Sequence, residues 1–216
     1  MGLDKSPQHK TEAECRAFYM KMIGTLAFVV APVLAFIVYF ALRFVPGQAE
    51  KIDAKFAFIA QHDLGWVFAS AVLVLLTRAY LTINSNGARA AARLDRPDQH
   101  IYKIMSPERP FADAPYVLMA TTGAAGRFNR AQRGAYNFDE AAPTFIVNLL
   151  LVACVFGPLA GVLGVLQMYG RTKFANDYKE DQSTRGTGFM LAMIAEQLTA
   201  GLVTLCTLKA FIPALP

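Results

Sequence analysis

Residues 141–170 read AAPTFIVNLLLVACVFGPLAGVLGVLQMYG, thirty consecutive positions without one charged side chain. A helix that crosses a bilayer needs about 20 predominantly apolar residues, so this run is too long for a single span. Gly157 and Pro158 lie near its middle, and a proline cannot continue the hydrogen bonds of a helix interior. The run therefore predicts two membrane helices joined by a tight hairpin.

Three further stretches have the length and composition of membrane spans. They are Met22–Leu42, Leu64–Ala88 with Arg78 inside it, and Gly186–Leu208 with Glu196 inside it. Together with the hairpin they predict five transmembrane helices, at about 18–44, 63–92, 126–156, 158–180 and 186–211. Pro32 is expected to kink the first helix, which is tolerated in membranes when neighbouring groups satisfy the freed carbonyl.

The composition agrees with a membrane protein and excludes several other classes. Hydrophobic residues make up 55% of the 216 positions and charged residues 17%, against about 45–50% and about 25% in a typical soluble domain. Cysteines and histidines are few and scattered, without a CxxC pair, and no glycine-rich phosphate loop or basic-aromatic pattern occurs. We therefore expect no disulfide framework, no metal site and no nucleic-acid partner, and an all-α integral membrane fold.

The basic residues indicate how the helices are oriented. Sixteen of the 21 Lys and Arg residues fall on the side that holds the N-terminus and the loops after the second and fourth helices. By the positive-inside rule this side faces the cytoplasm, or the matrix in a mitochondrial inner membrane. The organelle stays open between the endoplasmic reticulum and a mitochondrial membrane.

A first polar block, RFNRAQRGAYNFDEAAPTF (Arg127–Phe145), leads into the third helix. Its residues Arg130, Arg133, Asn137 and Glu140 follow at intervals of three, four and three, which places them on one helical face. Unpaired polar groups are costly in a membrane helix, so this face is expected to point into the bundle or at a ligand. An Arg–Glu pair that locks two helices together is the alternative interpretation.

A second polar block, YGRTKFANDYKEDQSTRGTGF (Tyr169–Phe189), ends the fourth helix and opens the fifth. Arg171, Phe174 and Tyr178 again share one face. Arg185 immediately precedes the last apolar run, where the beginning of a helix presents unpaired amide donors. The two blocks lie on the same side of the membrane and together predict a site for a small zwitterionic or anionic ligand.

Some polar and small residues inside the helices are expected to be structural. Glu196 is expected to accept interhelical hydrogen bonds, with a functional carboxylate as the alternative. Arg78 is expected to snorkel or to pair with a carboxylate rather than to act in catalysis. The series Gly157, Gly161 and Gly164 is expected to allow close helix packing.

The two blocks resemble the signature of the MAPEG superfamily, the membrane-associated proteins of eicosanoid and glutathione metabolism. The first carries F-N-x-x-Q-R-x-x-x-N-x-x-E-x-x-P from Phe128 to Pro143, and the second carries G-R-x-x-F-x-x-x-Y from Gly170 to Tyr178, with an arginine downstream. Within the superfamily, the closest resemblance is to the microsomal glutathione S-transferases of type 3. It covers about residues 62–212.

The resemblance implies a MAPEG-like four-helix domain at 62–216, with a long loop at about 84–126. Residues 1–61 would hold a polar leader, one extra transmembrane helix and a loop. The family assembles as a homotrimer with glutathione between subunits near the cytosolic face. At matching positions, the implied catalytic residue is Arg185, which would stabilise the thiolate, and the implied glutathione-binding residues are Arg133, Asn137, Glu140, Tyr178, Arg171 and Arg89.

The implied function is that of a membrane-bound glutathione S-transferase or glutathione peroxidase, acting on hydrophobic electrophiles or lipid hydroperoxides from the bilayer. A nearby guanidinium favours the reactive thiolate, and arginine forms bidentate pairs with carboxylates. The alternative is a non-catalytic MAPEG-like subunit, or a lipid-binding scaffold, of a larger membrane complex. The extra helix, Phe174 at a usual tyrosine position and Asp177 at a usual glycine position motivate this alternative.

Overall fold

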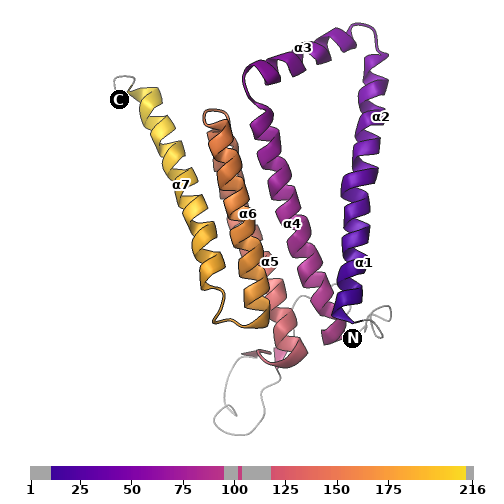
Figure 1. The fold of residues 1–216 in the computed structure, drawn as a ribbon, viewed down its shortest axis with the longest axis vertical. Coiled ribbons are helices and arrows are strands. Elements are labelled where there is room, and N and C mark those ends of the chain that lie inside the picture. Colours follow the sequence, from indigo (N-terminus) through magenta and orange to yellow (C-terminus); the bar gives the residue numbers. More distant parts are fainter. Residues whose placement is uncertain (1–10, 95–101, 104–117, 213–216) are drawn as a thin grey trace.

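The computed structural model describes residues 11–94, 102–103 and 118–212, and helices make up most of this part of the chain (Figure 1). The elements in chain order are α1 (Glu12–Thr25), the π-helical turn η1 (Leu26–Val30), α2 (Ala31–Arg43), α3 (Gln48–Gln61), α4 (Gly65–Ala92), β1 (Tyr102–Lys103), β2 (Leu118–Met119), α5 (Gly123–Ala153), α6 (Gly157–Glu180) and α7 (Gly186–Phe211). The two short strands pair antiparallel. The predicted all-α architecture is confirmed.

Four of the five predicted helices correspond closely to α4, α5, α6 and α7, and the Gly157-Pro158 hairpin separates α5 from α6 as expected. The first predicted helix begins earlier, at Glu12, because Thr11 and Glu14 form a capping box there. Two expectations need correction. The segment before α4 contains the helix α3 rather than only a loop, and the long connection begins at Arg93 rather than Asn84.

The last turns of α4 are helical because their small residues are buried against α5. Ala88 and Ala90 are 1% and 4% exposed, and Ala88 packs in one cluster with Phe128 and Ala131 of α5. This packing ends at Arg93, which adopts a left-handed conformation with φ 54°. The loop expected at about 84–126 is therefore shortened to the residues between α4 and α5.

Three helices are long and apolar enough to cross a membrane within the described ranges: the continuous N-terminal helix Glu12–Arg43, α4 and α7. These confirm an integral membrane protein and three of the five predicted spans. The apolar parts of α5 and α6 are shorter because the two polar blocks form one end of each helix. That α5 and α6 also span the bilayer stays a prediction.

The helices alternate in direction, so α1, the end of α4, the beginning of α5, the end of α6 and the beginning of α7 all lie at one end of the molecule (Figure 1). This end carries the two polar blocks, and we call it the basic end. The corner between α2 and α3 and the end of α7 lie at the opposite end. The arrangement is the one that the positive-inside argument predicts.

Glycines bring the helices of the α4–α7 bundle close together. Trp66 of α4 lies directly against Gly157 and Gly161 of α6, where an added Cβ would be 2.6 and 2.7 Å from the indole ring. Gly170 of α6 and Gly188 of α7 meet so closely that a Cβ on Gly188 would lie 2.3 Å from the backbone nitrogen of Phe174. Small residues at membrane helix interfaces allow this contact between backbones.

The N-terminal arm, residues 12–61, is attached to the bundle mainly where α1 packs on α4. Pro32 follows the π-helical turn η1, in which the amide of Ala31 donates to the carbonyl of Leu26. The helix thus accommodates the proline through a wider turn. No residue of α2 is buried, and α2 diverges from α4 toward α3 (Figure 1).

Candidate functional site

A cavity of about 370 Å³ opens between α5, α6 and α7 at the basic end, and we call it the α5–α7 cavity. It is lined by residues from both polar blocks: Arg133, Asn137, Phe174, Tyr178, Arg185, Gly186 and Phe189. Helical spacing places Arg133 and Asn137 on one face of α5, and Phe174 and Tyr178 on one face of α6. Four predicted site residues from three helices therefore share one cavity.

Arg133 forms a bidentate ion pair with Glu140, two turns further along α5. Its Nη1 and Nη2 atoms donate to the carboxylate at 2.7 and 3.2 Å, and both side chains are about half exposed. The predicted alternative of a pair between two helices therefore does not apply to Arg133, because both partners lie on α5. Arg133 lines the cavity, whereas Glu140 does not, so the pair presents its cation to a ligand there.

Arg171 connects three helices through its side chain. Its side chain is buried in α6 and donates to Asn137 of α5 and, at 2.5 Å, to Glu196 of α7. Gln167 also donates to Glu196, at 3.4 Å. The expected structural use of Glu196 is confirmed, and the arginine ties together the three helices that form the cavity.

Arg185 lies at the beginning of α7, beside Tyr178. Its guanidinium carbon is 5.1 Å from the centre of the Tyr178 ring, a cation–π geometry that holds the exposed arginine over the cavity. The loop before it is fixed by Ser183, whose backbone amide and hydroxyl donate to Asp181 at 2.7 and 2.8 Å. These hydrogen bonds lower the pKa of the Asp181 carboxyl.

The two positions that depart from the family pattern have local explanations. Phe174 is 6% exposed and contacts Tyr178 and Phe189, with ring centres 5.5 and 6.5 Å apart, so it forms an apolar wall of the cavity. Asp177 accepts a hydrogen bond from Lys173 at 2.8 Å, one turn back along α6, and does not line the cavity. Neither residue blocks the site.

A profile of the MAPEG family matches residues 22–205, which is most of the chain. The chain belongs to the MAPEG family. The match begins inside the N-terminal helix, 40 residues before the start of the stretch 62–212 that carries the motif resemblance, and it ends at residue 205. No curated protein gives a match.

MAPEG proteins are integral membrane helical bundles that interact with glutathione and lipids, and their general functions are those of glutathione transferases, peroxidases and eicosanoid-type enzymes. The α5–α7 cavity has a volume within the range of about 300–1,000 Å³ that is usual for small-molecule sites. Its arginines, amide and phenol supply donors for carboxylates and peptide carbonyls.

The structure does not bring every predicted residue to the α5–α7 cavity, because Arg89, Arg171 and Glu140 do not line it. Arg89 lies on α4 and lines a different cavity, between α1, α4 and α5. Arg130, which the spacing placed beside Arg133, donates instead to the backbone carbonyls of Thr121, Lys179 and Glu180. Arg130 thus satisfies free carbonyls at the end of α6 and has a structural role.

Two cavity residues were missed by the sequence argument. Gly186 and Phe189 belong to the first turn of α7 and line the cavity together with Tyr178. Phe189 is a ring within an apolar run, and nothing in its local sequence separates it from lipid-facing neighbours. Its place on the cavity depends on the close crossing of α6 and α7 at Gly170 and Gly188.

Proposed function

We propose that this chain is a membrane-bound glutathione transferase or peroxidase that binds glutathione in the α5–α7 cavity. The observation that carries the proposal is the convergence of Arg133, Asn137, Tyr178 and Arg185 from three helices on one cavity. Glutathione is a zwitterion with two carboxylates, so the Arg133 guanidinium suits its carboxylate ends. Membership of the MAPEG family supports glutathione as the co-substrate.

In this proposal Arg185 is the catalytic residue. A guanidinium favours the thiolate over the thiol, and the beginning of α7 adds a positive dipole end at the same place. The thiol loses its proton to solvent, and the thiolate sulfur forms a C–S bond to an electrophile as the electrophile's leaving group departs. With a hydroperoxide the thiolate attacks the terminal oxygen, the O–O bond breaks and the alcohol leaves after taking up a proton from solvent. A second glutathione then reduces the resulting sulfenic acid and gives glutathione disulfide and water. Asn137 is a binding residue, and Arg171 positions it through their hydrogen bond rather than through direct contact with the ligand.

The second substrate of the proposed reaction is a hydrophobic electrophile or a lipid hydroperoxide. Phe174 and Phe189 give the cavity an apolar side, and Phe189 is half exposed at the beginning of an apolar membrane helix. This side suits a molecule that approaches from the bilayer. We further propose a homotrimer, on the family resemblance, with exposed apolar side chains of α5 to α7 such as Val147, Val162 and Leu198 available for contact between subunits.

The test is glutathione binding to the detergent-solubilised protein by calorimetry, together with the ultraviolet absorbance of the bound thiolate and turnover of a model electrophile. Replacing Arg185 by alanine should abolish the thiolate signal and lower turnover at least about tenfold while changing glutathione affinity little. Arg93→Ala is the matched control, because Arg93 is exposed at the same end and lines neither cavity.

Each other outcome has a defined meaning. Glutathione binding without a thiolate signal in the unchanged protein would support the non-catalytic alternative. Unchanged turnover in Arg185→Ala would remove that residue from the mechanism, and no binding at millimolar glutathione would overturn the proposal. The mass of the purified particle separates the assemblies, since a stable homotrimer without other chains would count against membership of a larger complex.

A further inference from the structure

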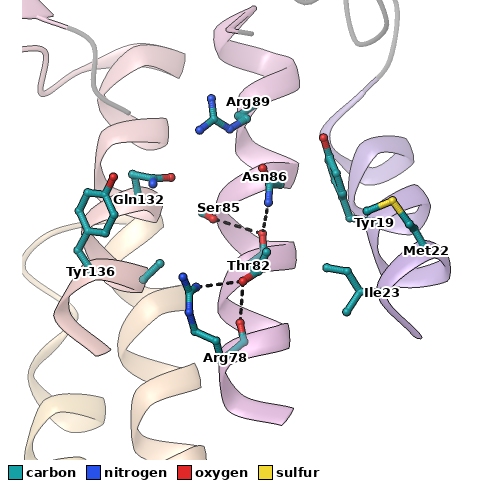
Figure 2. Close-up of a pocket in the computed structure, with 11 residues that line it drawn as sticks. Tyr19, Met22, Ile23, Arg78, Thr82, Ser85, Asn86, Arg89, Gln132 and Tyr136 are labelled. Carbon is teal, nitrogen blue, oxygen red and sulfur yellow. Dashed lines mark hydrogen bonds between the residues drawn. The ribbon is translucent and has the colours of Figure 1, made fainter. Parts of the chain in front are cut away.

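A second cavity, of about 530 Å³, lies between α1, α4 and α5, and we call it the α1–α4 cavity (Figure 2). Tyr19, Met22 and Ile23 of α1 face the polar side chains of α4 across it, and Gln132 and Tyr136 of α5 form its remaining side. The α1–α4 cavity shares no lining residue with the α5–α7 cavity. The N-terminal arm is therefore part of a site that the proposed glutathione reaction does not use.

The lining of the α1–α4 cavity favours an anion. Arg78 and Arg89 both line it, with hydroxyl and amide groups between them, and no acidic side chain lines it among the described residues. Arg78 donates to Thr82 at 3.0 Å and pairs with Asp139 at 2.9 Å, so its charge is largely compensated. Arg89 is 6% exposed, with its guanidinium 5.0 Å from the centre of the Phe128 ring. A buried guanidinium beside hydroxyl and amide groups suits a phosphate or carboxylate.

The depth of the cavity points to a lipid. Arg89 lies in the last turn of α4 at the basic end, where lipid headgroups are expected, whereas Met22 and Ile23 begin the apolar part of the N-terminal span. Basic pockets between membrane helices on this side are suited to the headgroups of anionic lipids. A soluble anion would gain nothing from the apolar wall that α1 contributes.

Exposed apolar surfaces lie next to the cavity. Beyond η1, α2 diverges from α4 and has no buried residue (Figure 1). The first half of α4 exposes the apolar side chains of Phe68, Val72 and Leu75. Chains that leave the headgroup would run along these apolar surfaces in the direction of α3. The arm is anchored at α1, so it covers the headgroup while leaving the chain region open to the bilayer.

We propose that the α1–α4 cavity binds the phosphate headgroup of an anionic phospholipid, whose acyl chains lie between α2 and α4. Arg89 is the principal headgroup contact, and Tyr19, Met22 and Ile23 form a cover that the N-terminal arm supplies. This assignment is independent of the proposed glutathione reaction, because the two cavities share no lining residue.

The experiment counts lipids bound to the full chain by native mass spectrometry in detergent, with dioleoyl-phosphatidylglycerol as the probe. Dioleoyl-phosphatidylcholine has the same chains without net charge, oleate has a chain with a carboxylate, and glycerol phosphate has the headgroup without chains. The expected result is a saturable stoichiometric site for phosphatidylglycerol that the other three do not fill at the same concentration. Equal binding of phosphatidylcholine or glycerol phosphate, or preference for oleate, would overturn the proposal.

Two variants locate the site. Arg89→Gln should weaken phosphatidylglycerol binding about tenfold, the size of one lost charge-assisted hydrogen bond, whereas Arg93→Gln removes the same charge one turn away and should leave it unchanged. Ile23→Trp keeps both arginines and fills the cavity from α1, so it should also weaken phosphatidylglycerol binding. This variant keeps the proposal testable even where Arg89→Gln does not fold. The proposal would be overturned if Ile23→Trp bound phosphatidylglycerol as tightly as the unchanged protein does. It would also be overturned if Arg89→Gln lost as much glutathione affinity as Arg133→Gln.

Discussion

In the α4–α7 bundle the helices approach until backbone touches backbone, whereas the N-terminal arm meets the bundle over little more than α1. The bundle is fixed at Gly170 and Gly188 and by the buried Arg171, which joins three helices. The arm has a single buried residue, Cys15, and is tied down by charges at its first turn. The difference teaches that helices of one membrane protein can be held by close packing in one region and by charged groups at one end in another.

The charges that hold the arm converge on Glu12. Lys179, which is buried at the end of α6, donates to Glu12 and to Asn84 of α4, both at 2.9 Å. Arg127 of α5 also pairs with Glu12 and with Glu180. One carboxylate of the arm is thus shared by two helices of the bundle, and this network lies at the basic end.

The largest effect should come from breaking the packing of the bundle. Gly188→Leu places a side chain where the backbone of Phe174 lies, so α6 and α7 must separate, and we expect a loss of more than about 4 kcal/mol of unfolding free energy. Gly201→Leu is the control, because nothing lies within 4 Å of a Cβ at that position of the same helix. Thermal unfolding in detergent measures both, and equal stabilities would show that the helices do not cross this closely.

A smaller effect should follow from removing Glu196 and leaving Arg171 buried without its carboxylate. A buried charge that loses its partner costs about 3 kcal/mol, so Glu196→Ala should be clearly destabilised. It should also weaken glutathione binding, because Asn137 loses a fixed neighbour. The double variant Arg171→Met with Glu196→Met removes both charges and should recover much of the stability but not the glutathione affinity. Full recovery of affinity would contradict the positioning role of Arg171.

The smallest effect on the bundle should come from Glu12→Ala. Lost hydrogen bonds to charged groups cost about 1.5 kcal/mol, so the amides of α1 should exchange their hydrogens roughly tenfold faster, while those of α6 and α7 exchange as before. Lys21→Ala is the control, since it removes an exposed charge from the same helix and leaves the capping box intact. Faster exchange throughout the bundle would show that arm and bundle unfold as one unit.

The sequence predicted the four bundle helices and the N-terminal span, but neither α3 nor the contacts that attach the arm, for physical reasons. Uncharged runs and the Gly157-Pro158 pair defined α4 to α7 because membrane helices are required to be long and apolar. The helix α3 was missed because residues 48–61 are too polar for a span, so their amphipathic pattern was passed over. Where α1 meets α4 depends on Glu12 and Lys179, which are 167 positions apart.

The sequence predicted some of the residues that line the α5–α7 cavity and misplaced others. Spacings of three and four correctly placed Arg133 with Asn137 and Phe174 with Tyr178, because the helical period fixes which side chains share a face. The same spacing also predicted Arg130 on this face, but its side chain donates to a backbone carbonyl at the end of α6. The family resemblance implied Arg89 as a site residue, but Arg89 lines the α1–α4 cavity instead. The rotation of each helix about its axis relative to its neighbours decides which cavity a side chain reaches. The local sequence does not determine this rotation.

The π-helical turn η1 also sets how the arm faces its surroundings. Each residue in a helix turns the following side chains by about 100°, so the one additional residue in this turn rotates α2 relative to the face that α1 presents to α4. The helical register of the N-terminal span therefore changes at η1, between α1, which packs on α4, and α2, which has no buried residue. Deleting a single residue within 26–30 would merge the two registers and carry α3 around the helix axis with α2.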